Sequence, residues 1–83
     1  MKAKKAVALR YEQHRDMAPR VVAKGAGEVA EAILRIARQS QVSVREDVGL
    51  VDALMNLELQ SVIPEELYAV VAEVLAVVYQ GRR

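Results

Sequence analysis

The side chains that most often perform chemistry are few in this sequence, and none is arranged with partners. His14 is the only histidine, and it lies in the charged stretch EQHRD of a chain that contains no cysteine. Metal binding and general-base catalysis need organised partners, so we interpret His14 as a solvated loop residue. The adjacent carboxylates Glu46-Asp47 and Glu65-Glu66 point apart along the chain and do not resemble an acid/base dyad. We therefore expect a non-enzymatic protein without catalytic residues, metal ligands or cofactors.

The stretch Lys24-Gly25-Ala26-Gly27 places a Gly-x-Gly between a predicted strand and a predicted helix, which is one feature of phosphate-binding loops. The dinucleotide fingerprint is incomplete, because Ala30 occupies its third glycine position and no clear acidic residue follows about twenty positions later. We favour a tight turn with close helix packing. A small anion- or nucleotide-binding domain that uses this turn is the alternative function, and stabilisation by phosphate ligands that Lys24→Ala abolishes would reveal it.

Length and composition limit the possible classes. The 83 residues make one domain, residues 1–83, with a core at about 6–80. Twelve basic and eleven acidic side chains give a net charge of +1, and three tyrosines are the only aromatic residues, so no nucleic-acid partner is indicated. The lack of cysteine fits a reducing compartment, and no apolar run reaches the roughly twenty residues of a membrane span. We expect a soluble, cytoplasmic protein.

Hydrophobic periodicity predicts three strands. AVALRY (6–11) suits a pleated surface, RVVAKG (20–25) is a short apolar run opened by Pro19, and VSVRED (42–47) alternates apolar and polar residues. Because a helix separates the last two strands with short joints, they are predicted to form a βαβ unit and to lie parallel in one sheet.

Three helices are predicted from apolar positions at steps of three and four residues. They span 26–39, 49–59, and the stretch from Pro64 to about Tyr79, where proline suits the first helical position. The predicted fold class is α/β: a small mixed sheet of about three strands packed with three to four helices, in the order β-β-α-β-α-α.

The last predicted helix carries more apolar surface than a core stripe requires. At about 100° per residue, Leu67 and Val78 lie at the centre of the buried arc, and Ala72 and Leu75 lie at its edge. This flank is either a docking strip for a partner or a surface that a loop or the second helix covers, since scattered apolar side chains are ordinary on protein surfaces.

Several segments resemble one known family in its order and nearly its spacing. VALRY (7–11), AP followed by VVAKGA (18–26), and IPEELY with VAEVLA (63–76) closely resemble the cytoplasmic C-terminal domain of the FlhB/YscU family of type III secretion proteins. The resemblance runs from about Ala6 to Gln80, and it favours a flagellar relative over an injectisome one.

In that family, a membrane domain, a linker and a strand ending in an Asn-Pro-Thr-His motif precede the segment matched here. Met1-Lys2-Ala3-Lys4 stands where the motif would fall. The resemblance therefore implies a stand-alone FlhB-like protein without autocleavage. It corresponds to the fragment that family members generate by cutting themselves and that stays bound to the other half. A sheet that lacks this first strand would expose unpaired backbone, which a partner strand can fill by β-addition.

The resemblance also implies function and partners. We expect a cytoplasmic component or regulator of flagellar type III protein export at the inner face of the membrane export gate. It is expected to stand in for the cleaved fragment and to act in the substrate specificity switch. Its expected partners are the N-terminal half of an FlhB-type membrane protein and export substrates or a hook-length control protein, with membrane contact only through the gate. The rival is a separate regulator that binds soluble partners without joining the gate.

A docking surface proposed for the family maps onto Ala18, Pro19, Ala72 and Leu75, and the last two coincide with the flank reached from helical geometry. The chain departs from the family at two points of its second helix. Val48-Gly49 stands where a proline pair is frequent, and Asp52 stands where a basic residue is frequent. These departures affect contacts of the second helix and, through them, the choice of partner.

Overall fold

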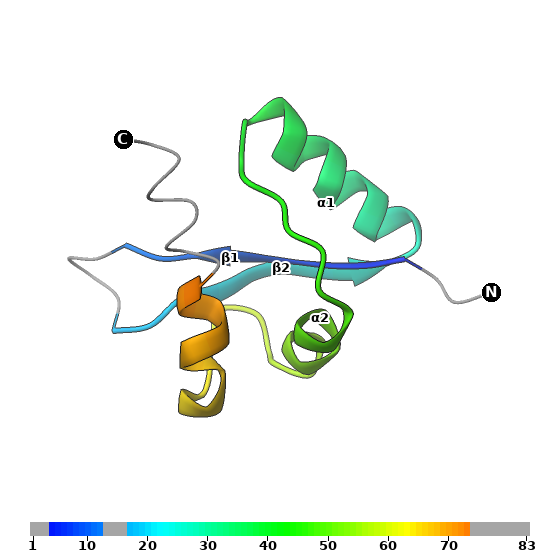
Figure 1. Ribbon diagram of the computed structural model, residues 1–83. Coiled ribbons are helices and arrows are strands. Elements are labelled where there is room, and N and C mark those ends of the chain that lie inside the picture. Colours follow the sequence, from blue (N-terminus) through cyan, green and yellow to red (C-terminus); the bar gives the residue numbers. More distant parts are fainter. Residues whose placement is uncertain (1–3, 13–16, 74–83) are drawn as a thin grey trace.

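The computed structural model describes residues 4–12 and 17–73, and it places one helix on one face of a short sheet and helical segments on the other face (Figure 1). The elements are β1 (Lys5–Arg10), β2 (Arg20–Ala26), α1 (Glu28–Gln39), α2 (Val48–Met55) and a 3-10 turn (Glu65–Leu67). Residues 68–73 continue from that turn as a helix. The predicted α/β class is confirmed.

The two strands form an antiparallel pair. Lys5 lies opposite Ala26 at one end, and the register shifts between Ala8 and Leu9, where the bulge increases the local twist of the pair. Both strands were predicted within one residue of their observed bounds, because short runs of apolar and β-branched residues between polar or proline-containing stretches favour extended backbone.

Residues 42–47 were predicted to be a third strand, and this prediction is wrong for the sheet that the described residues form. The segment has no ladder partner, and the sheet contains only β1 and β2, so the parallel βαβ pairing is absent. Alternating apolar and polar residues favour an extended backbone, but a strand also needs a neighbour, which the alternation does not specify.

Helix α1 confirms the predicted helix, and its packing confirms the tight turn at its start. A Cβ atom added at Gly25 would overlap Val29 Cγ1 and lie 2.7 Å from Val29 Cβ, so only glycine allows this approach of strand and helix. Gly27 has a φ of 61°, which glycine adopts without strain, and it leads the chain into α1. The centre of the buried face is Ala30, whereas Ile36 is 56% exposed.

The largest group of buried side chains lies on the face of the sheet opposite α1. Its fully packed members come from the loop before β2, from α2 and from the C-terminal part: Ala18, Leu54, Ile63 and Val71. Val7 and Leu9 of β1 pack against this cluster, as do leucines of the helical segments. Burial of these apolar surfaces is the main stabilising contribution of this layer.

Helix α2 is shorter than the predicted 49–59. Asp47 caps its start, because Asp47 Oδ1 accepts a hydrogen bond from the Leu50 N–H at 3.0 Å. The helix ends at Met55, where Lys24 Nζ donates to the carbonyl oxygen of Met55 at 3.0 Å and to that of Leu57. A lysine that binds the last carbonyls of a helix stabilises its end and complements its dipole.

The final helix begins one residue later than predicted, because Pro64 was expected at the first helical position but has an extended backbone and caps the turn. Pro64 precedes the 3-10 turn, and Glu65 and Glu66 occupy the first turn, where the dipole favours negative charge. Its predicted end at Tyr79 lies outside the described residues, as does His14. No helix within the described ranges has the length and apolar character that crossing a bilayer requires.

Candidate partner-binding surfaces

The outer edge of β1 has unpaired backbone groups. The Gly27 N–H donates to the Lys4 carbonyl oxygen at 2.7 Å, and this pair continues the register of the β1–β2 ladder. In this part of β1, the even-numbered residues are therefore the ones that exchange backbone hydrogen bonds with β2. Antiparallel ladders alternate, and the N–H and C=O groups of Lys5 and Val7 therefore point away from β2. No backbone hydrogen bond within the described residues satisfies them. This edge has the geometry that accepts an added strand.

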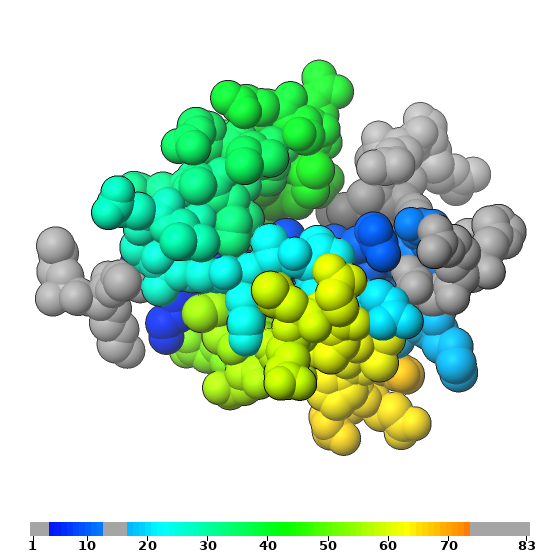
Figure 2. Space-filling view, turned by 180° about the vertical axis from the view of Figure 1, so that it is seen from behind, coloured from blue at the N-terminus to red at the C-terminus, as the bar shows by residue number. Residues whose placement is uncertain are grey.

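The other edge of the sheet is partly covered. The Val21 N–H donates to Ser61 O at 3.0 Å, the Gln60 N–H donates to Val21 O at 2.7 Å, and the Ile63 N–H donates to Pro19 O at 3.0 Å. The space-filling view from behind shows this segment lying beside β2 (Figure 2). The first half of β2 is thus occupied by the chain itself, which leaves β1 as the strand with the free edge.

The four residues that the resemblance singles out are in different environments. Ala18 is 3% exposed and belongs to the buried cluster, and Pro19 is also buried. Ala72 is exposed on the final helix, one residue after the buried Val71. Leu75 lies outside the described residues. As a docking surface these four positions stay a prediction, in which Ala72 is accessible and Ala18 and Pro19 are buried.

A shallow apolar groove of about 200 Å³ lies between α2 and the final helix. Its lining consists of residues from both helices and the cap of α2: Asp47, Gly49, Leu50, Ala53, Leu67 and Val70. Val70 is 40% exposed, and Tyr68 on the same helix is 44% exposed. At about 100° per residue, Ala72 lies on another side of the final helix than the groove residues Leu67 and Val70, so the groove is a separate apolar surface.

Two donors that an anion site at the turn before α1 would use, the Lys24 ammonium group and the Gly27 N–H, are engaged elsewhere. Lys24 reaches the C-terminal end of α2 on the opposite side of the sheet from α1, and its ammonium group is engaged by the two carbonyl oxygens there. The Gly27 N–H is bonded to Lys4 O. Glu28 and Glu31 lie in the first turn of α1, where they oppose a negatively charged ligand. The geometry therefore argues against anion or nucleotide binding at this turn.

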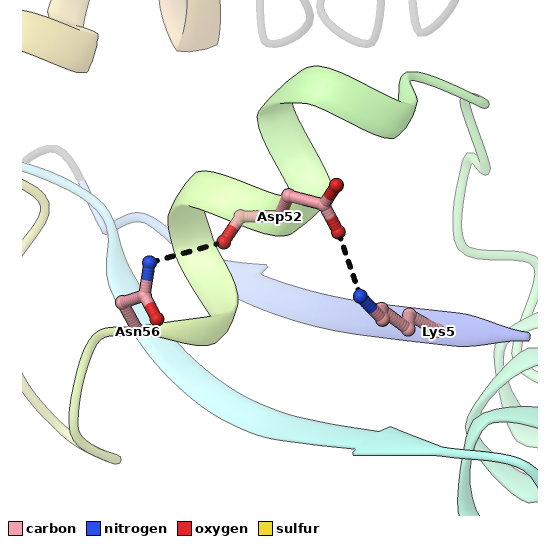
Figure 3. A network of polar contacts seen from close by, with 3 residues as sticks. All are labelled: Lys5, Asp52 and Asn56. Atoms are coloured by element: carbon pink, nitrogen blue, oxygen red, sulfur yellow. Dashed lines mark hydrogen bonds and ion pairs between the residues drawn. The ribbon is translucent and has the colours of Figure 1, made fainter. Parts of the chain in front are cut away.

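One polar contact between β1 and α2 was not anticipated from sequence. Lys5 Nζ lies 3.0 Å from Asp52 Oδ1, and Asn56 Nδ2 donates to the Asp52 carbonyl oxygen at 3.4 Å along the helix (Figure 3). The two residues are 47 positions apart in the sequence, so no local pattern predicts that they meet. The unusual acidic residue at position 52 was the only hint of this contact in the sequence.

The described residues form a small α/β domain in which the outer edge of β1 has no strand neighbour. The sequence matches the FlhB HrpN YscU SpaS family over residues 3–78, and the chain belongs to this family. This confirms the family that the resemblance indicated.

Individual relatives show how much of their length the chain represents. It is 43% identical to the protein YlqH of Bacillus subtilis, over 93% of this chain and 83% of YlqH. It is 47% identical to the flagellar biosynthetic protein FlhB of Escherichia coli, over 93% of this chain but only 20% of FlhB. The crystal structure of the cytoplasmic domain of FlhB from Shewanella putrefaciens superimposes with a TM-score of 0.89 at 39% identity, covering 95% of this chain and 62% of that one. The chain thus corresponds to an FlhB-type C-terminal domain and spans about a fifth of the FlhB sequences.

Proposed function

We propose that this chain acts in flagellar type III protein export by standing in for the C-terminal fragment of an FlhB-type export-gate protein. The observation that carries the proposal is the unpaired outer edge of β1, where the backbone of Lys5 and Val7 is free to bind a strand. In the family resemblance, the preceding strand of the membrane-bound half occupies this position. The likeness to YlqH, 83% of which this chain matches, shows that the family includes a protein little longer than this domain.

The proposed activity is binding without catalysis. The chain docks through β1 on the membrane-bound half of an FlhB-type protein and presents the apolar flank around Ala72 to export substrates or to a hook-length control protein. Small apolar contacts give modest affinity and fast release, which suits a surface that must pass each substrate onward. The proposed location is the cytoplasm, at the inner face of the export gate.

Complementation tests the proposal directly. The chain is expressed in cells whose FlhB-type protein ends just after the asparagine of its Asn-Pro-Thr-His motif, and export of early and late flagellar substrates is measured. We expect export to be restored, because strand addition at β1 re-forms the sheet. The order in which early and late substrates appear reports whether the chain also switches specificity.

Two variants at one position give a matched control. Lys5→Pro and Lys5→Ala both remove the contact with Asp52, but only proline removes the outward N–H of β1 and adds a ring at the edge. We expect Lys5→Ala to restore export and Lys5→Pro to restore it poorly. If the wild-type chain is folded and present in the cells but restores no export, the replacement model is wrong, and a separate regulator of export becomes the better explanation.

A further inference from the structure

The groove between α2 and the final helix plays no part in the proposed function. Both helices lie on the same face of the sheet (Figure 1), and the groove between them has a volume of about 200 Å³. Pockets that enclose a drug-sized ligand are larger, at roughly 300–1,000 Å³. The groove is therefore of a size to receive apolar side chains of a partner rather than a small molecule.

The walls of the groove are apolar side chains on two helices. Leu50 and Ala53 come from α2, and Leu67 and Val70 come from the final helix. Most backbone N–H and C=O groups of a helix bond within that helix, so these walls offer no ladder to an incoming strand. A segment that enters the groove must therefore satisfy its own backbone, as an amphipathic helix does.

The borders of the groove are acidic. Asp47 lines the groove as the cap of α2, and the exposed Glu46 precedes it directly. Glu66 and Glu73 are also exposed. They lie four residues before and three residues after Val70, and this spacing places them on its side of the final helix. Carboxylates thus stand at one end of the groove and along one of its walls.

Few basic side chains offset this charge. Arg45 is the only basic residue in 45–53 and 65–73, the two described segments that contain every lining residue. Lys5 reaches α2 but is paired there with a carboxylate, and Lys24 is engaged by carbonyl oxygens at the other end of α2. An apolar groove with a negative border is complementary to an apolar stripe flanked by lysines or arginines, and it disfavours the anionic surface of a bilayer.

We propose that this groove is a further partner site, which takes a basic amphipathic helix of another polypeptide. Apolar side chains three or four residues apart on that helix enter between Leu50 and Val70, and the lysines or arginines beside them meet Glu66 and Glu73. The site is separate from the edge of β1 and from Ala72. It therefore does not depend on strand addition or on a role in export.

The test uses the full chain and a fluorescent synthetic helix that has leucines at steps of three and four residues with lysines on both sides of this stripe. One control peptide has the same composition in scrambled order. Affinity is measured by fluorescence anisotropy, and changes in amide NMR signals locate the site. We expect the amphipathic peptide to bind more tightly than the scrambled one, to bind more weakly as salt rises, and to shift the signals of the lining residues. Binding without shifts at those residues would overturn the proposal.

A pair of charge-removing substitutions tests the acidic border. Glu66→Gln combined with Glu73→Gln is compared with Glu28→Gln combined with Glu31→Gln, which removes two exposed charges from α1 on the opposite face of the sheet. We expect the groove pair to lower peptide affinity about three- to tenfold at low salt, with little effect of the control pair, and the difference to vanish at high salt. Equal losses would trace the attraction to overall charge and overturn the proposal.

Val70→Ser tests the apolar wall, and Ala69→Ser at a neighbouring exposed position of the same helix is its control. Val70 is 40% exposed, so both variants should fold. We expect about three- to tenfold weaker peptide binding for Val70→Ser alone, because apolar contact area is lost.

Other occupants of the groove would give different results. A dimer in sedimentation experiments that Val70→Ser dissociates would assign the groove to a second copy of this chain. Binding to vesicles of phosphatidylserine that Val70→Ser weakens would assign it to a membrane surface. Either result would overturn the proposal, as would failure of the folded wild-type chain to bind the amphipathic peptide.

Discussion

Lys5 Nζ and Asp52 Oδ1 lie 3.0 Å apart, and this ion pair joins the start of β1 to the middle of α2 (Figure 3). Asp52 stands where the family resemblance leads one to expect a basic residue. The ion pair places this acidic side chain opposite Lys5 of the edge strand. It therefore provides a structural reason for one of the two departures from the family pattern. The contact also lies close to the proposed docking edge, because Lys5 belongs to β1.

The ion pair itself should contribute little to stability. The two side chains are 43% and 53% exposed, and exposed pairs typically contribute about 0.2–1 kcal/mol. We expect a double-mutant cycle of Lys5→Ala and Asp52→Ala, measured by urea unfolding, to give a coupling in that range which decreases in high salt. A coupling that is large and insensitive to salt would contradict a solvent-screened pair.

Lys24 should contribute much more than an ordinary surface lysine. Its part-buried ammonium group donates to the carbonyl oxygens of Met55 and Leu57. Lys24→Met keeps much of the aliphatic length and leaves both carbonyls without this donor, so we expect a loss of about 1–3 kcal/mol in the free energy of unfolding. The control is Arg35→Ala on the exposed face of α1, for which a change within about 0.5 kcal/mol is expected. Equal effects of the two substitutions would argue against the role of Lys24 at the end of α2.

Gly25 should tolerate no side chain while Val29 is present. Gly25→Ala places a Cβ atom inside the contact distance of Val29, and we expect destabilisation of about 1–3 kcal/mol, as found for overpacked sites. Val29 is 54% exposed, so Val29→Ala alone should have a small effect. Val29→Ala removes Cγ1 but keeps Cβ, which lies 2.7 Å from the added atom, so recovery of only part of the lost stability is expected in the double variant. Such a partial recovery, measured by thermal unfolding, would confirm the steric cause, whereas additive losses would exclude it.

Ile63 should be among the most costly positions to truncate. It is 1% exposed and packs in the buried cluster, so Ile63→Ala is expected to lower the free energy of unfolding by about 2–5 kcal/mol. Leu59→Ala removes a comparable aliphatic side chain that is 54% exposed, and its effect should stay below about 1 kcal/mol. Urea unfolding of both variants measures the difference, and similar losses would show that the two sites are not packed as described.

Ala18 and Ala72 should respond differently to an acidic side chain. Ala18→Asp introduces a carboxylate into the buried cluster and is expected to unfold much of the protein. Ala72→Asp changes an exposed position and should leave thermal stability nearly unchanged, while it weakens binding of export substrates in pull-down assays. Full substrate binding by a folded Ala72→Asp protein would remove Ala72 from the proposed docking flank.

Much of the architecture followed from local sequence features. The apolar runs around Val7 and Val21 are the two strands, the periodicity of residues 26–39 is α1, and Pro64 marks the start of the last helix. Gly25 was assigned to close helix packing, and the structure confirms it. These features depend on backbone preferences and on which face of an element is apolar, and both are set by residues close together in the chain.

Only the tertiary structure decided which segments pair and which side chains are reachable. Residues 42–47 have a strand pattern but no neighbour, whereas residues 60–63 take a place beside β2. Lys24 belongs to the end of α2 because it meets Met55, which is 31 residues away. Ala18 is buried because side chains of β1, of α2 and of the C-terminal part pack in the same cluster. The sequence by itself determined the elements, because local preferences specify them; their partners depend on contacts between distant residues, which only the folded chain brings together.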